Sequence, residues 1–234
     1  MRLLLLHAFP LDGRMWLGQR GVAAPGGTWA PTLYRLGASI EDWAAALAGY
    51  LDAGPTVVVG CSIGGSCALE LVRQAGDRVA ALVLVSTKAG HRPEPAQRDG
   101  YLSVLRAGGV PGLWRRMAGQ FFDPDADPAV VAQARALAYA QRPGDLAGAI
   151  TAFHSRPDLT GVVERWDRPL TVVVGERDGV AADPVARAAA LAARAPRGQL
   201  RVVPGAGHFP NLQRTAEFNA ILAGTIRSCM EPPR

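Results

Sequence analysis

The hexapeptide Gly-Cys-Ser-Ile-Gly-Gly occupies residues 60–65, directly after the apolar run Thr56 to Val59 and directly before a stretch with helical spacing. A G-x-S-x-G sequence between a strand and a helix is typical of a tight turn whose strained backbone exposes the serine hydroxyl. The glycines fit because a side chain beside the turn would collide with it. The bare pattern is also found in ordinary glycine-rich turns. Its position between strand and helix favours Ser62 as a nucleophile.

Strand-like and helix-like segments alternate along most of the chain. Continuous apolar runs, which strands buried on both faces require, occupy residues 3–6, 56–59, 79–85, 170–174 and 200–203, with a weaker one at 28–30. Patterns with helical spacing occupy residues 39–54, 62–75, 183–195 and 218–226. The helix at 183–195 opens with Asp183 as the expected N-cap and Pro184 in the first turn. This alternation predicts an α/β fold, with a mainly parallel sheet covered by helices on both faces.

Residues 89–165 interrupt the alternation with amphipathic stretches that prolines such as Pro111 and Pro143 break. We interpret this region as a helical cap inserted into one α/β core, which residues 1–88 and 166–234 form. The large apolar side chains of the region are Tyr101, Trp114, Met117, Phe121, Phe122 and Tyr139. Attachment of the cap helices to the core explains most of them, and the lining of an acyl pocket is the alternative.

The composition limits the class of protein. A chain of 234 residues with 49% apolar and 19% charged residues fits one globular domain. The leucine run 3–6 is too short for a secretory signal, and no apolar stretch reaches the ~20 residues that span a bilayer. Cys61, Cys67 and Cys229 have no metal-type spacing, which favours a reducing cytoplasm and indicates no metal site. The net charge of +5 forms no patch with interleaved aromatics, so we expect no nucleic-acid partner.

A histidine and a carboxylate after later strands supply the partners that a serine nucleophile needs. A serine is activated by an imidazole within hydrogen-bond reach, and His208 follows the strand at 200–203 on a glycine-rich loop. The imidazole is oriented by a carboxylate, and Asp178 follows the strand at 170–174 in the chain order Ser, acid, His. We therefore expect Ser62, Asp178 and His208 to form a catalytic triad.

Two other acidic residues on the same loop are rivals of Asp178. Asp183 is better explained as a helix cap, and Glu176 comes immediately after the strand. His7, at the end of the first strand, is a rival base, although a histidine at a strand end more often fixes a loop by hydrogen bonding. Asp178 and His208 remain the favoured pair.

Backbone amides are expected to bind the oxyanion of an acyl-transfer reaction. The N–H of Ile63 lies at the start of the helix that follows Ser62, where unpaired amides favour negative charge. The second donor belongs on the loop after the first strand, which makes the N–H of Phe9 the candidate.

Together these motifs resemble the α/β-hydrolase family, above all its small bacterial esterase-like and lactonase-like members. The stretches that carry the resemblance over almost the whole chain are residues 7–12 (His-Ala-Phe-Pro-Leu-Asp), 60–65, 156–158 (Arg-Pro-Asp), 175–178 (Gly-Glu-Arg-Asp) and 205–210 (Gly-Ala-Gly-His-Phe-Pro). The resemblance implies the same triad and a cap over the catalytic centre. Ala8 departs from the glycine that the family usually has in its oxyanion loop, and Cys61 is uncommon beside the nucleophile. A buried, inert thiol is the expectation for Cys61.

The leading hypothesis is a serine hydrolase of small carboxylic esters, thioesters or lactones that works through an acyl-enzyme. Alternatives are a lyase, cyclase, perhydrolase or C–C hydrolase on the same fold, and a ligand-binding protein without catalysis. We expect a small acyl substrate, no organic cofactor, no membrane partner, and a monomer or homodimer. The arginines of residues 89–165 are interpreted as a solvated surface, with attraction of a carboxylate or an acidic carrier protein as the alternative.

Overall fold

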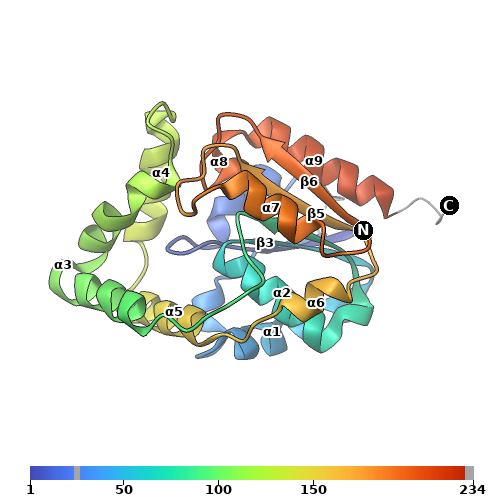
Figure 1. The fold of residues 1–234 in the computed structure, drawn as a ribbon, viewed down its shortest axis with the longest axis horizontal. Coiled ribbons are helices and arrows are strands. Elements are labelled where there is room, and N and C mark those ends of the chain that lie inside the picture. The colour runs from blue at the N-terminus through green and yellow to red at the C-terminus, as the bar shows by residue number, and fades with distance from the viewer. Residues whose placement is uncertain (24–26, 230–234) are drawn as a thin grey trace.

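A six-stranded sheet forms the centre of the protein in the computed structural model, which describes residues 1–23 and 27–229 (Figure 1). The strands are β1 (Arg2–Leu6), β2 (Thr28–Trp29), β3 (Thr56–Cys61), β4 (Val79–Val85), β5 (Leu170–Gly175) and β6 (Gly198–Val203). Their spatial order is β2-β1-β3-β4-β5-β6, and each neighbouring pair is parallel. The order reverses at β1, because β2 lies on one side of it and β3 on the other. Open α/β sheets bind their ligands at the carboxyl ends of the strands beside such a reversal.

Helices cover both faces of this sheet, as the alternation of segments predicts. Leu4 and Leu6 of β1 pack into the cluster that includes α1 (Ile40–Ala48), α2 (Ile63–Ala75), α6 (Thr160–Glu164) and α7 (Pro184–Ala192). Leu3 and Leu5 pack on the opposite face, against the 3₁₀ helix η1 (Gly13–Gln19) and α9 (Thr215–Ser228). Side chains alternate between the two faces along a strand, so the continuous apolar run of β1 follows from burial on both sides.

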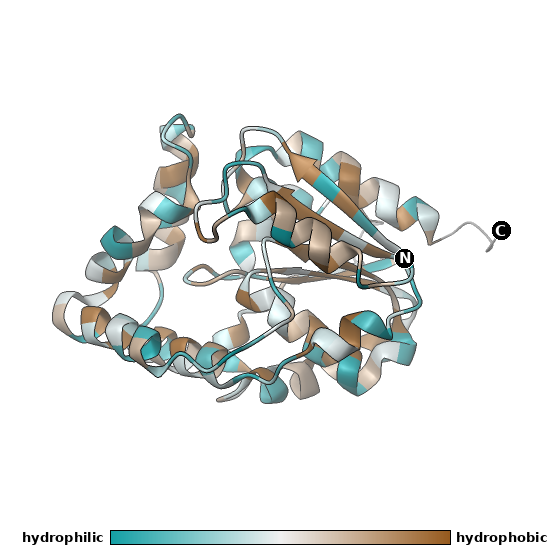
Figure 2. Ribbon diagram, viewed as in Figure 1, coloured by the Kyte–Doolittle hydropathy of each residue, from teal (hydrophilic) through white to brown (hydrophobic). Residues whose placement is uncertain are grey.

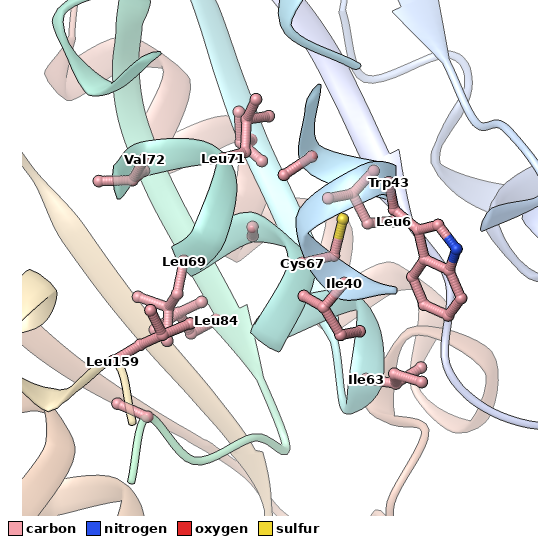
Figure 3. Close-up of a cluster of buried hydrophobic side chains, with 14 of the residues drawn as sticks. Leu6, Ile40, Trp43, Ile63, Cys67, Leu69, Leu71, Val72, Leu84 and Leu159 are labelled. Carbon is pink, nitrogen blue, oxygen red and sulfur yellow. The ribbon is translucent and has the colours of Figure 1, made fainter. Parts of the chain in front are cut away.

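The packing of α2 on the sheet fixes the start of that helix. Cys67 and Leu69 of α2 lie in one buried cluster with Leu6 of β1 and Leu84 of β4 (Figure 3). The strands in the middle of the sheet are the most uniformly hydrophobic elements, while the helices alternate apolar and polar residues (Figure 2). Each fully buried leucine contributes about 1.5–3 kcal/mol. Ser62, which precedes α2, is therefore held firmly at the carboxyl end of β3.

Several boundaries differ from the sequence prediction. The helix predicted at 218–226 begins earlier, at Thr215, and the one predicted at 39–54 ends as α1 at Ala48 and continues as a 3₁₀ turn over Gly49–Ala53. A capping box opens α1, since Ser39 and Asp42 each accept the other's backbone N–H. Double-sided burial is wrong for β6, which is an edge strand with most of its residues exposed or half-buried.

The region predicted as a cap consists of helices that lie mostly to one side of the sheet (Figure 1). These are α3 (Pro95–Phe121), which is kinked at Gly109, α4 (Pro128–Tyr139) and α5 (Pro143–Ser155), while α6 packs beside α2. Trp114, Phe121 and Phe122 are buried in the same cluster as β1 and β3, so these aromatic residues attach the cap to the core as predicted. The boundaries at residues 89 and 165 remain a prediction. No helix in the described ranges has the length and apolarity to cross a bilayer.

Candidate active site

Ser62 occupies a strained turn between β3 and α2. Its backbone has φ 54° and ψ −117°, in a region that residues other than glycine rarely adopt. Its N–H donates to the carbonyl of Val85 at 2.9 Å, and the Thr87 hydroxyl donates to its carbonyl at 2.7 Å. A Cβ on Gly64 would lie against the backbone carbonyl of Leu6, so only glycine allows this approach of α2 to β1. The surrounding contacts hold a conformation that costs about 1–3 kcal/mol by itself.

The two expected oxyanion donors lie beside Ser62. Ile63 is the first residue of α2, and Phe9 lies on the loop after β1. Both residues line the same cavity as Ser62. Within residues 1–23 and 27–229, neither backbone N–H donates to a protein acceptor. Two unpaired amides, one of them at a helix N-terminus, form an environment in which negative charge on a substrate oxygen is stabilised.

His208 and Asp178 form a buried pair at the ends of β6 and β5. The Nδ1 of His208 lies 2.8 Å from Oδ2 and 3.0 Å from Oδ1 of Asp178, and both residues are almost fully buried. Burial alone would raise the pKa of Asp178, but the charge and hydrogen bond of His208 and the N–H of Val180 outweigh it, so this pKa lies below its ordinary value. An ionised Asp178 accepts the proton of Nδ1, which leaves the lone pair of Nε2 free to act as a base.

Asp178, His208 and Ser62 all line one cavity of about 720 Å³, together with Phe9 and Ile63. The structure therefore brings all the predicted site residues to one place. No hydrogen bond joins the Ser62 hydroxyl to the imidazole within the described residues. Bonds between nucleophile and base are often long in enzymes without substrate and tighten when substrate binds.

Phe121, at the end of α3, holds His208 in place. Its carbonyl accepts the backbone N–H of His208 at 2.8 Å, and its ring stacks on the imidazole with a centroid separation of 5.5 Å. The preceding carbonyl, of Gln120, accepts the N–H of Gly179 at 3.1 Å, next to the acid. Neither contact could be predicted from the residue pattern, in which only the aromatic character of Phe121 is apparent. The last turn of a cap helix thus fixes the loops of both His208 and Asp178.

His7 has a structural role, as the sequence analysis favoured. Its Nε2 accepts the N–H of Leu33 at 2.8 Å, and its Nδ1 lies 3.1 Å from the carbonyl of Ala8. Burial lowers the pKa of His7 to about 4, against which the Ala8 carbonyl and the more distant Asp12 have a smaller effect. A neutral imidazole with both nitrogens bonded to backbone groups ties the loop after β1 to residues 32–36.

The rival carboxylates lie outside this pair. Glu176 is exposed and accepts the N–H of Gly205 at 3.0 Å. Asp183 occupies the N-cap position of α7, as predicted. The prediction that its side chain caps the helix is wrong, because that side chain accepts no hydrogen bond from the helix. Its left-handed backbone, with φ 49°, turns the chain into the helix in place of a side-chain cap. Neither carboxylate is bonded to a histidine.

Cys61, next to the nucleophile, is fully buried. Burial raises its pKa well above the ordinary value, and the charge of Asp178 adds to this effect. A buried thiol that stays protonated is unreactive, as predicted for Cys61.

The model of the Alpha/beta hydrolase family matches residues 3–221 of this chain. The chain belongs to the α/β-hydrolase family. A pimeloyl-(acyl-carrier protein) methyl ester esterase from Aromatoleum aromaticum is 28% identical to this α/β-hydrolase over an alignment of 252 positions, gaps included, which covers 96% of this chain and 98% of the relative. The predicted fold and the resemblance to bacterial esterases are therefore confirmed.

Solved structures of other α/β-hydrolases are similar over nearly the whole chain. A thermophilic esterase from Thermogutta terrifontis has a TM-score of 0.88 and 26% identity, with 98% of this chain and 90% of that chain covered. An enol-lactonase from Burkholderia xenovorans LB400 has a TM-score of 0.82, with 96% and 90% covered, and at 21% identity it supports the fold alone. Esterase is the activity that the names of the more similar relatives share, which agrees with the predicted class of carboxylic ester hydrolases.

Proposed function

We propose that this α/β-hydrolase is a cytoplasmic serine hydrolase that cleaves a small carboxylic ester, thioester or lactone through an acyl-enzyme. The observation that carries the proposal is the hydrogen-bonded His208–Asp178 pair in the same cavity as Ser62, whose backbone is strained. The names of the relatives support an ester as the substrate. Cys61, Cys67 and Cys229 are all free, which is compatible with a reducing compartment.

The proposed reaction begins when Nε2 of His208 takes the proton of the Ser62 hydroxyl. The serine oxygen attacks the carbonyl carbon of the substrate, and the electrons of the carbonyl bond move to its oxygen. The imidazolium then returns the proton to the leaving alcohol or thiol, so the bond between carbonyl and leaving group breaks. A water molecule repeats the sequence on the acyl-enzyme and releases the acid. Asp178 remains ionised throughout and stabilises the imidazolium.

The amides of Phe9 and Ile63 bind the oxyanion in this scheme. Preorganised donors stabilise charge that develops only in the transition state, and the loss of one such donor commonly lowers kcat by about 10²–10³-fold. Both amides belong to the backbone, and Ala8 therefore does not remove a donor even though it replaces the family's usual glycine.

A carrier-bound acyl group is part of the proposed substrate range. The A. aromaticum relative is named for an ester of a carrier-bound acid. The cavity of this chain is open to solvent at exposed residues such as Lys88 and Arg187, so one end of a substrate can remain outside.

The test compares Ser62→Ala with the matched control Ser66→Ala, which changes a buried serine of the same helix. With short p-nitrophenyl esters, we expect Ser62→Ala to lose turnover and labelling by a fluorophosphonate probe, and Ser66→Ala to keep both. Undiminished turnover in Ser62→Ala would exclude the mechanism. Labelling of the wild type at another residue would exclude Ser62 as the activated nucleophile.

A further inference from the structure

The lining of the active-site cavity includes cationic side chains that form no ion pair within the described residues. Lys88, Arg116 and Arg187 line the cavity, and none of them forms an ion pair within the described residues. Arg194 also lines it but is paired with Glu164 at 2.7 Å. The unpaired charges of the lining are thus mostly positive.

The acidic groups of the lining do not balance these cations. Asp178 is committed to His208, at 2.8 Å. Glu94 is the other carboxylate of the lining. Its single negative charge does not neutralise the three unpaired cations. A cleft lined by an excess of one sign of charge focuses the field on its ligand.

Lys88 comes directly after a residue that is hydrogen-bonded to Ser62. It follows Thr87, whose hydroxyl donates to the carbonyl of Ser62 at 2.7 Å. Partial burial lowers the pKa of Lys88, and the charges of Arg156 and Arg187 lower it further, against a smaller opposite effect of Glu94. The ammonium group thus lies among cations in the wall of the cavity where the substrate is turned over.

Arg156 contributes a fixed charge behind this wall. The residue is only 3% exposed, and its Nη2 has no hydrogen-bond partner within the described residues. Its guanidinium carbon lies 3.7 Å from the ring centre of Phe153, which lines the cavity. Burial lowers its pKa to about 10, against smaller opposite effects of Glu94 and Asp158, so the group stays charged at neutral pH. A buried charge without a full set of hydrogen bonds is costly, and a nearby anion reduces the cost.

The same field acts on two histidines. Burial and then the charge of Arg156 lower the pKa of both His91 and His154. His154 lines the cavity, and its carbonyl lies 3.1 Å from Nε2 of His91. Apart from burial, the charges that lower these two pKa values include those of Arg156 and Lys88, and Glu94 acts against them, so cations predominate at this end of the cavity.

We infer that the substrate carries, besides the ester that Ser62 attacks, a second and negatively charged group, a carboxylate or a phosphate, which Lys88 and Arg187 bind. This inference rests on the proposed function and narrows its substrate class to anionic esters. The anion supplies the counter-charge that the lining lacks. It also fixes the orientation of the substrate, because the charged end lies against the cations while the ester reaches the oxyanion donors.

The kinetic test compares matched substrates that differ in charge. Monomethyl esters of dicarboxylic acids of increasing length carry one carboxylate, and the corresponding dimethyl esters carry none. A third series, methyl esters of acids with a terminal phosphate, distinguishes phosphate from carboxylate. We expect the wild type to favour one anionic series over the diesters in kcat/KM, and to lose this preference at high salt.

Variants of the cationic residues test the assignment. Lys88→Met and Arg187→Gln should each lower the ratio of kcat/KM for the anionic ester over the diester by about tenfold, as expected for one charge-assisted hydrogen bond. Arg135→Gln, an exposed position that does not line the cavity, should leave this ratio unchanged. Equal kcat/KM for charged and uncharged esters in the wild type would overturn the inference while leaving the proposed hydrolysis intact.

A binding measurement separates the inference from the proposed hydrolysis. Lys88 is the only lysine of the chain, so reductive ¹³C-methylation of Ser62→Ala places a label on Lys88 and otherwise only on the N-terminal amine. The Lys88 methyl resonance, assigned by its absence in Ser62→Ala/Lys88→Met, should shift on titration with the monomethyl ester and not with the diester. A shift without any turnover in the wild type would support the anion site and refute the hydrolysis. An unchanged resonance at saturating ester would overturn the inference.

Discussion

His7 should make the stability of the fold depend on pH. Its side chain is fully buried and has a folded-state pKa of about 4, while a histidine in the unfolded chain has the ordinary value of 6.5. Between these values the unfolded chain binds a proton that the folded chain does not. Stability therefore rises with pH in this window and falls as the solution is acidified from neutral pH towards the folded pKa. Below the folded-state pKa, the stability that the neutral His7 contributes is lost completely.

The magnitude follows from the difference between the two pKa values. A difference of 2.5 units, from 6.5 to about 4, corresponds at 1.36 kcal/mol per unit to a loss of about 3 kcal/mol in the free energy of unfolding. Such a loss is a large part of the 5–15 kcal/mol by which a typical domain is stable. The loop after β1, which carries Phe9, should be among the first parts affected, because His7 bonds it to Leu33.

The assay is urea unfolding of the wild type and His7→Gln at several pH values between about 7 and about 4. The glutamine does not titrate, and its amide oxygen can still accept the N–H of Leu33. Other groups titrate alike in both proteins, so the difference between their unfolding free energies isolates His7. We expect His7→Gln to be the less stable protein at neutral pH and to recover about 3 kcal/mol relative to the wild type on acidification. If the difference in unfolding free energy between the two proteins did not change with pH, the conclusion that the buried imidazole of His7 is neutral would be refuted.

Three further predictions concern the site. Asp178→Asn keeps the volume but removes the carboxylate that selects the Nδ1–H tautomer of His208, so kcat for an ester should fall by about 10⁴-fold with the fold intact by circular dichroism. Phe121→Ala should cost about 3–5 kcal/mol in urea unfolding because the ring is buried between cap and core, whereas Phe121→Leu should cost much less. Iodoacetamide should modify the half-buried Cys229 of the native protein before the fully buried Cys61, and mass spectrometry of peptides would show the reverse order if the thiol beside Ser62 were reactive.

The central part of the site could be predicted because each member follows a strand at a recognisable turn. Ser62, Asp178 and His208 come just after β3, β5 and β6, and parallel strands bring their carboxyl ends to one edge of the sheet. Each of these turns can be recognised from a short stretch of sequence, and the parallel topology then brings the three residues together. This is why the triad was expected from sequence, as were the fold and the loop role of His7.

Other features could not be predicted because they depend on long-range packing. The contact of Phe121 with His208 joins the end of a cap helix to a loop far along the chain, and no periodicity encodes it. The exposure of β6 depends on its place at the edge of the sheet, which an apolar run does not reveal. Arg187 and Lys88 belong to different segments of the core, so their shared place in one cavity appears only in the folded chain.

The anchored end of α3 limits how substrates can reach the site. Gln120 and Phe121 accept backbone hydrogen bonds from the loops of Asp178 and His208, and Arg177 pairs with Asp123 at 2.9 Å just beyond the helix. A rigid rotation of the whole helix would break these bonds or displace Asp178 and His208 together. Gly109, with φ 59° and ψ −163°, interrupts the helix well before this anchored end. The last turns of α3, beyond the kink, are therefore tied to the loops of Asp178 and His208, whereas the turns before the kink do not share these bonds.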